Sequence, residues 1–300
     1  MTVPEEVNKE DLLFIINPQS GKGNYKYAIN SIYEHVEPNK YNVIIEKTEY
    51  KGHASKIAEL YKEKGIKKIV AVGGDGTINE IGIAIINTDI SLGIIPRGSG
   101  NGLARYLSIP LNVKNAIEVI NNHSIKIIDA ATINDKYFFC TSGVGLDARV
   151  GIIFNKSKKR GSIMYFKATV SEFMTYKPKK YKLKIDNISR KVKSILITFA
   201  NAGQYGNNVY ISPDAKIDDG LLDLCILKPF PKSIMLPIGL RLISKTLNKS
   251  KYLEVIRCKE IILKRKKNIK FHYDGETSKA GKKIAVKIIP QSLKVMIPSY

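Results

Sequence analysis

The chain has 300 residues, 44% of them hydrophobic, so it can bury a sizeable core, and its length favours two domains. A formal net charge of +22 favours polyanionic partners: nucleic acid, an anionic membrane or nucleotide phosphates. Three scattered cysteines predict reduced core residues, and four histidines without metal-binding spacing argue against zinc chemistry. No apolar run is long enough for a membrane-spanning helix, and the acidic start is the reverse of a signal peptide. We therefore expect a cytoplasmic protein.

The first half of the chain alternates short apolar runs with segments of helical periodicity, which predicts βαβ units on a parallel sheet. Strands are predicted at residues 12–17, 41–48, 66–74 and 91–96. Helices are predicted at residues 53–64, 77–86 and 113–121. Residues 1–127 therefore form a Rossmann-like α/β domain in this interpretation.

The second half of the chain consists of short β-type runs, many of them alternating, separated by turn residues. This pattern predicts a largely antiparallel β domain over residues 128–289. Two helical insertions are expected in it, around residues 161–176 and 231–248.

A glycine-rich turn, Gly73–Gly76, follows the third predicted strand and precedes a helix expected to begin at Thr77. The glycines permit close backbone approach, and the free N–H groups of a helix start suit a phosphate. Thr77 and Glu80 have capping-box spacing. The same residues also make an ordinary capped turn, and the motif alone does not separate the two interpretations. Asp75 beside a phosphate would indicate Mg²⁺ or proton transfer.

Two more glycine-rich turns, at residues 17–23 and 96–102, follow other predicted strands of the same half. Ligands of doubly wound sheets bind at the carboxyl ends of the strands, so the three turns predict one shared site. Lys22, Arg97 and Arg105 could add positive charge there.

One further motif, residues 143–148, has the spacing of a dinucleotide fingerprint. It lies in the β-rich half with no βαβ unit after it, so we interpret it as a bend. The string of a P-loop ATPase does not occur in the sequence.

Four motifs in order, residues 17–23, Thr48 with Gly52-His53-Ala54, residues 73–80 and residues 96–105, resemble the diacylglycerol kinase catalytic-domain family. That family includes bacterial lipid kinases and the sphingosine and ceramide kinases. The resemblance implies a nucleotide-binding α/β domain, a C-terminal antiparallel β-sandwich as in NAD kinases, and a final segment, 290–300, that returns to the first domain. It implies an ATP site lined by Asn17, Pro18, Gln19, Ser20, Gly21, Thr48, Gly73, Gly74, Asp75, Gly76, Thr77, Asn79, Glu80 and Ser99.

Two acidic segments of the second half also resemble parts of that family. Asp218–Asp223 resembles its structural Mg²⁺ loop, which implies a cation held by Asp219 and the carbonyl groups of Lys216 and Leu221. Asp218 could exchange roles with Asp219, and the segment by itself also fits an ordinary hairpin turn.

The catalytic Asp-Gly-Glu of the family resembles residues 274–276. Phosphoryl transfer needs positioning, charge neutralisation and a base. The resemblance implies Glu276 as first choice for the base, Asp274 as second, and Asp75 as a third candidate.

The predicted function is an ATP-dependent lipid kinase that uses ATP and Mg²⁺ and phosphorylates a lipid hydroxyl in an interdomain cleft. Gly98–Ala104 resembles the sphingosine and ceramide kinases more than bacterial diacylglycerol kinases, so the acceptor is diacylglycerol or a sphingoid-type lipid. One alternative is an NAD kinase-like enzyme, against which the turns at 17–21 and 98–101 argue. The other is a basic nucleic-acid-binding or regulatory protein on a degenerate kinase fold, for which no recognition motif is present.

Basic and apolar residues occur together in two segments, which predicts peripheral contact with an anionic membrane. In the first, Lys156, Lys158, Lys159 and Arg160 precede apolar residues 163–166, with Lys177, Lys179, Lys180 and Lys182 beyond. The second is residues 231–251. We expect a lipid substrate at a membrane surface as partner, no nucleic acid, and allow for a homodimer.

Overall fold

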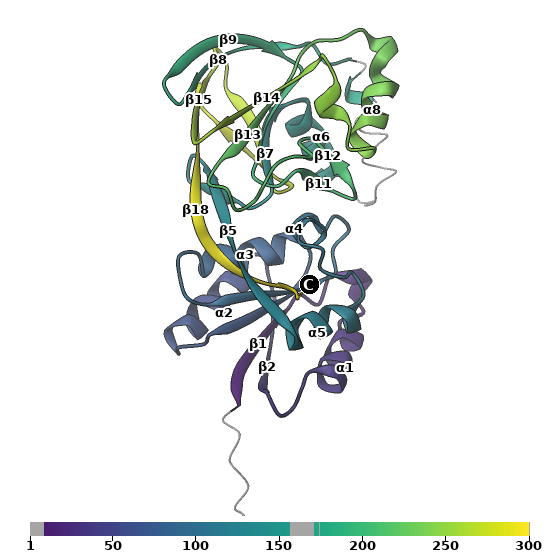
Figure 1. Ribbon diagram of the computed structural model, residues 1–300, viewed down its shortest axis with the longest axis vertical. Coiled ribbons are helices and arrows are strands. Elements are labelled where there is room, and N and C mark those ends of the chain that lie inside the picture. Colours follow the sequence, from purple (N-terminus) through teal and green to yellow (C-terminus); the bar gives the residue numbers. More distant parts are fainter. Residues whose placement is uncertain (1–8, 157–170, 174, 300) are drawn as a thin grey trace, which may run out of the picture. The chain divides into compact units, whose positions relative to one another are not determined.

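A computed structural model describes residues 9–156, 171–173 and 175–299 of the chain (Figure 1). The described residues divide into two compact units. Unit 1 lies within residues 1–127 and 293–300, and unit 2 within residues 128–292. The chain passes between the units within two strands, β5 (His123–Ile133) and β18 (Lys283–Pro298).

Unit 1 is built on a parallel sheet in the order β2-β1-β3-β4. Its strands are β1 (Glu10–Ile16), β2 (Tyr41–Lys47), β3 (Lys68–Gly73) and β4 (Ser91–Pro96). The end of β18 extends the sheet, because Lys294 and Val295 pair in parallel with Ser91 and Leu92 of β4. Successive residues of β1, β3 and β4 are buried, as expected where both faces of a parallel sheet are covered.

The helices of unit 1 alternate with these strands. They are α1 (Tyr25–His35), α2 (His53–Glu63), α3 (Asp75–Ala84), α4 (Gly102–Tyr106) and α5 (Val113–Asn121). Helix α2 packs on α3, and α1 packs on α5. The predicted α/β architecture is confirmed, although α3 begins two residues before the predicted start at Thr77.

Unit 2 is a sandwich of two antiparallel sheets, as predicted. One sheet has the order β14-β13-β10-β7-β16-β17, and the other contains β18-β15-β8-β9. The first is formed by β7 (Thr141–Gly145), β10 (Leu196–Ala200), β13 (Leu222–Leu227), β14 (Leu253–Cys258), β16 (Ile269–Tyr273) and β17 (Glu276–Ala280). The second is formed by β8 (Lys179–Ile185), β9 (Ile188–Ser194), β15 (Glu260–Lys264) and β18. Residues of both sheets, among them Phe199, Phe271, Leu263 and Val286, share one core.

Short elements complete unit 2. They are β6 (Lys136–Phe138), paired with β5, helix α6 (Leu146–Lys156), and the two-stranded sheet of β11 (Gln204–Gly206) and β12 (Val209–Tyr210). The insertion predicted at 231–248 is helical, with η2 (Lys232–Ile234), α8 (Met235–Ile243) and η3 (Leu247–Lys249). Most of the insertion predicted at 161–176, and the basic and apolar cluster at 158–166, lie outside the described residues.

Residues 143–148, interpreted from the sequence as a bend, span the end of β7 and the start of α6. Strand β7 leads directly into α6, and Gly145 makes the junction with a φ of 104°. Both neighbours of β7, β10 and β16, are antiparallel to it, so this strand-to-helix step is not part of a parallel βαβ unit. No helix in the described part of the chain is long and apolar enough to cross a bilayer.

Candidate active site

The three glycine-rich turns of unit 1 meet at the carboxyl ends of β1, β3 and β4. Backbone hydrogen bonds continue the sheet into the turns: Asn17 N donates to the Val72 carbonyl at 3.0 Å, and Arg97 N donates to the Gly73 carbonyl at 2.7 Å. Thr48, after β2, donates in the same way to the Ile16 carbonyl at 2.9 Å. The predicted convergence of the turns is therefore present within this unit.

Gly74 and Gly98 show why the turns after β3 and β4 need glycine. A Cβ atom on Gly98 would lie 2.7 Å from the Gly74 Cα atom, and one on Gly74 would lie 3.0 Å from the Gly98 Cα atom. Side chains at both positions would push the two backbones apart. Glycine at these two positions therefore allows the backbones of the two turns to lie close together.

The Asp75 carboxylate ties the same two turns together. One oxygen accepts from Asn101 N at 2.9 Å and the other from Gly102 N at 2.7 Å. Burial raises the pKa of the Asp75 carboxyl, and these two N–H groups oppose the rise. Asp75 is therefore a turn-holding residue in this structure, with both carboxylate oxygens already engaged by backbone donors.

The capping box predicted for Thr77 and Glu80 is wrong. Gly74 precedes the first residue of α3, so Thr77 lies inside the helix and not at its cap. Thr77 Oγ1 accepts from Asn17 Nδ2 at 3.3 Å, and Glu80 Oε1 accepts from Gly52 N at 2.9 Å. Both side chains thus bind neighbouring turns, those after β1 and β2, instead of each other.

Arg97 links the turn after β4 to the turn after β1. Its Nη2 donates to the Asn24 carbonyl at 2.8 Å, and the guanidinium lies where a Cβ atom of Gly21 would be. Burial lowers the pKa of Arg97. Within the described residues the buried Nε has no hydrogen-bond partner. An anionic ligand would satisfy such a donor, and sequence analysis had treated Arg97 only as added charge.

The remaining predicted nucleotide residues lie in or beside these turns. Ser20 Oγ donates to the Asn17 carbonyl at 2.8 Å, and Gln19 N donates to Asn17 Oδ1 at 3.0 Å. These bonds close the first turn. Ser99 is exposed, and Pro18, Thr48 and Asn79 are half-buried. Backbone N–H groups, an exposed hydroxyl and an unsatisfied guanidinium donor form a set that fits the phosphates of ATP.

In unit 2, Asp274 and Gly275 form the two-residue turn between β16 and β17. Both have positive φ, 40° and 86°, as in a type I′ hairpin turn. The Asp274 carboxylate accepts from the N–H groups of Phe139, Cys140 and Thr141 at 2.6, 2.9 and 2.9 Å. These three bonds anchor the turn to the segment before β7.

Glu276 follows as the first residue of β17, opposite Tyr273 and half-buried. Its position is fixed by the Asp274 anchor two residues earlier. Asp274 therefore holds the turn that carries Glu276 in place.

The predicted cation loop belongs to a hydrogen-bonded acidic cluster in unit 2. Asp219 Oδ1 accepts from Leu221 N at 3.1 Å, and its other oxygen pairs with Arg257. Asp129, fully buried, accepts from Gly220 N and Gln291 N, both at 2.7 Å. Burial raises the pKa of Asp129, its two backbone donors oppose the rise, and the nearby Asp219 and Asp218 add to it. Sequence analysis missed Asp129.

The chemistry of this loop fits a hydrated hard cation. Its donors are oxygen atoms, which Mg²⁺ prefers. Asp219 would share its carboxylate between the cation and Arg257. Among the described residues there is no cluster of three or more His, Cys, Asp or Glu side chains placed to hold a metal by themselves, so backbone carbonyls and water would have to complete the site.

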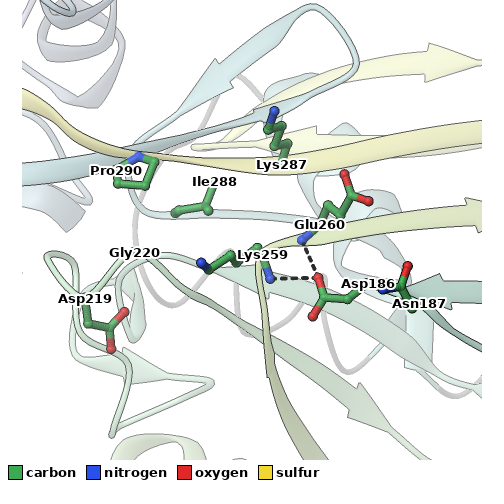
Figure 2. Close-up of a pocket in the computed structure, with 9 residues that line it drawn as sticks. All are labelled: Asp186, Asn187, Asp219, Gly220, Lys259, Glu260, Lys287, Ile288 and Pro290. Carbon is green, nitrogen blue, oxygen red and sulfur yellow. Dashed lines mark hydrogen bonds between the residues drawn. The ribbon is translucent and has the colours of Figure 1, made fainter.

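A pocket opens in unit 2 next to this loop (Figure 2). Asp186 lies in it and accepts from Lys259 N at 3.1 Å and Glu260 N at 3.0 Å. Of the predicted site residues, only Asp219 lines this pocket. The pocket therefore does not coincide with the candidate catalytic turn at 274–276.

A buried polar network lies where β7 meets α6, and sequence analysis missed it. Asp147 Oδ2 lies 3.1 Å from His272 Nε2, accepts from Thr198 Oγ1 at 3.0 Å and accepts from the Tyr205 hydroxyl at 3.3 Å. Gly143 makes room for it, because a Cβ atom there would lie within 3.0 Å of Asp147, Ile197 and His272 atoms. The glycines of the 143–148 motif thus serve packing.

Comparison with known proteins agrees with this architecture. Residues 11–133 match the model of the diacylglycerol kinase catalytic domain, and residues 141–297 match the YegS C-terminal NAD kinase beta sandwich-like domain. The chain is 26% identical over 294 residues to the "Probable lipid kinase YegS-like" protein of Yersinia enterocolitica, covering 96% of each chain. It is 29% identical over 221 residues to the diacylglycerol kinase of Bacillus subtilis, covering 71% of this chain and 72% of that one.

A solved structure extends the likeness to the whole fold. The crystal structure of a diacylglycerol kinase from Bacillus anthracis superposes with a TM-score of 0.75 at 19% identity, covering 97% of both chains. The chain therefore belongs to the diacylglycerol kinase catalytic-domain family of lipid kinases.

Proposed function

We propose that the protein transfers the γ-phosphoryl group of ATP to the hydroxyl of a membrane lipid, with diacylglycerol as the first acceptor to test. Family membership supports a lipid kinase, and two relatives are named diacylglycerol kinases. The observation that carries the donor side is the meeting of three glycine-rich turns around Asp75 and Arg97. A sphingoid-type acceptor is the second candidate, because the Gly98–Ala104 segment resembles the sphingosine and ceramide kinases.

On the donor side, the turns after β1, β3 and β4 bind the phosphates through backbone N–H groups, and Arg97 Nε donates to a phosphate oxygen. The start of α3 adds the positive end of its dipole. Asp75 keeps the turns after β3 and β4 together and so sets the positions of those donors. The charge that develops on the phosphoryl oxygens needs such prepositioned donors.

On the acceptor side, Glu276 accepts the proton of the lipid hydroxyl. As that proton leaves, the hydroxyl oxygen forms a bond to the γ-phosphorus, and the bond from this phosphorus to the β-γ bridging oxygen breaks, so that ADP leaves. Asp274 keeps the turn before Glu276 in place. Mg²⁺, held by Asp219 and the carbonyl groups of Lys216 and Leu221, would offset the negative charge of that acidic loop when bound.

The test is phosphoryl transfer from labelled ATP by the purified full chain, with Mg²⁺ and detergent-dispersed lipid. Diacylglycerol, a sphingoid base and NAD are offered in parallel. Labelled phosphatidic acid from diacylglycerol is the expected product. A labelled sphingoid base would instead identify the second candidate, a sphingoid-type lipid, as the acceptor. Labelling of NAD alone, or of nothing, would overturn the proposal.

A further inference from the structure

Helix α8 of unit 2 exposes a stripe of large apolar side chains. Leu236, Leu240 and Ile243 are 64%, 58% and 61% exposed. At 100° per residue they fall within an arc of about 60° on the helix, so they form one continuous strip, here called the α8 stripe. Other exposed apolar residues of the described chain, such as Ile188 and Leu60, stand on different elements.

The opposite side of α8 fixes the orientation of this stripe. Ile238 is only 6% exposed and lies in a core cluster with Leu247, Leu253 and Cys225, against which Met235 and Leu242 also pack. Because the helix is anchored by that side, it cannot bury the stripe by rotating. Contiguous exposed apolar patches are typical of interaction sites.

The chain segment that carries the stripe has charged side chains of one sign. From Leu224 to Leu253 the chain contains no Asp or Glu and six basic residues, Lys228, Lys232, Arg241, Lys245, Lys249 and Lys251. Lys232 and Lys245, just before and just after α8, are exposed, as are Lys249 and Lys251. An apolar stripe with basic flanks is complementary to a surface that is anionic outside and apolar beneath.

We propose that α8 docks on an anionic bilayer, with the α8 stripe inserted among the lipid headgroups and the neighbouring lysines on acidic lipids. The choice of a bilayer over a protein partner rests on the proposed function, because a lipid kinase has to reach a substrate that resides in a membrane. A second copy of this chain fits less well, since a stable dimer needs about 800 Å² per partner and the stripe offers three side chains.

The absence of tryptophan from the chain permits a direct test. In Leu240→Trp the only indole lies in the stripe, and in the control Ile188→Trp it lies on β9, at a residue 72% exposed. Without ATP, vesicles of phosphatidylcholine and phosphatidylserine should shift the emission of L240W to shorter wavelength and leave I188W unchanged. No shift in L240W, or an equal shift in both, would overturn the proposal.

A second experiment measures vesicle binding itself. The triple variant L236Q/L240Q/I243Q should bind the same vesicles roughly 100-fold more weakly than the unsubstituted chain, from the apolar area that it no longer buries. The matched control I188Q should bind as the unsubstituted chain does. Glutamine keeps helix propensity, and a circular dichroism spectrum checks that the fold is retained.

The remaining outcomes separate this proposal from the proposed function and from dimerisation. Phosphorylation of a dispersed short-chain diacylglycerol should be equal in the triple variant and the unsubstituted chain. If no lipid is phosphorylated while vesicle binding still depends on the stripe, the proposed function fails and this inference stands. Unchanged vesicle binding by the triple variant, with a change from dimer to monomer in sedimentation, would instead make the stripe an interface between copies and overturn the proposal.

Discussion

The two units hold their candidate residues in different ways. In unit 1 the candidate phosphate-binding groups are mostly backbone N–H groups of three turns, and Asn17, Asp75 and Arg97 join those turns to one another. In unit 2 the candidate chemistry is carried by a side chain, Glu276, and another carboxylate, Asp274, holds its turn. A backbone site is sensitive to anything that moves a turn, whereas a side-chain site is sensitive to one functional group.

This difference predicts different signatures for substitutions in the two units. Changes in unit 1 should alter stability and nucleotide affinity together. Replacement of Glu276 in unit 2 should alter the turnover number alone.

The largest effect is expected for Glu276→Gln. Without a base for the acceptor hydroxyl, kcat should fall about 10²- to 10⁴-fold, while ATP affinity, measured by calorimetry, stays unchanged. Glu260→Gln is the matched control, because Glu260 is also the first residue of a strand in unit 2. Full activity of E276Q would show that Asp274 or Asp75 is the base.

Asp274→Asn should act on stability. Asparagine tolerates the positive φ of this turn, but its single oxygen cannot satisfy three N–H donors, so buried donors lose partners. We expect urea unfolding to show a loss of about 2 kcal/mol. Asp135→Asn, at an exposed loop residue, should stay within about 0.5 kcal/mol. A stable D274N protein that lacks turnover would contradict the positioning role and make Asp274 catalytic.

In unit 1, Gly98→Ala tests the close approach of two turns. The added methyl would lie 2.7 Å from the Gly74 Cα atom, so unfolding free energy should fall by roughly 1–3 kcal/mol and ATP affinity should fall with it. Gly76→Ala is the matched control for stability, because its Cβ atom would meet nothing within 4 Å. That variant should lose no stability. Equal stability of the two variants would show that the turns do not need this contact.

The sequence predicted those parts of the fold that local patterns encode. Buried apolar runs followed by glycine-rich turns placed β1, β3 and β4 and the convergence of their turns, because parallel strands end at the same edge of a sheet. Alternating runs separated by turns likewise predicted the antiparallel sandwich.

The unpredicted features depend on partners far away along the chain. Thr77 and Glu80 have capping-box spacing, yet they bind residues 60 and 28 positions away. Asp129 accepts a hydrogen bond from Gln291, which lies 162 positions away in the sequence, and Asp274 accepts one from Phe139, which lies 135 positions away. A spacing rule considers only neighbours in sequence, so it assigned Thr77 to a cap and gave no reason to select Asp129.

The smallest effect concerns pH and contrasts a carboxylate of each unit. Burial raises the pKa of Asp75 in the folded protein. The contribution of the protonated Asp75 carboxyl to stability is therefore fully present below the ordinary pKa of aspartate, near 3.9. It is lost as pH rises through the higher folded-state pKa. The hydrogen bond from Arg190 lowers the pKa of Glu254, so its contribution is present at neutral pH and is lost as pH falls through its folded-state value.

Stability measured against pH should therefore change slope in opposite directions in Asp75→Asn and Glu254→Gln. D75N should remove a decline that begins above about pH 4, and E254Q should remove a loss below that pH. The second effect should stay under about 1 kcal/mol because the Arg190 pair is partly exposed. Subtracting the unfolding free energy of the unsubstituted chain at each pH removes the contributions of the titratable groups that all three proteins share. Slope changes of the same sign would mean that the Asp75 carboxylate is stabilised, not strained, by its two backbone donors.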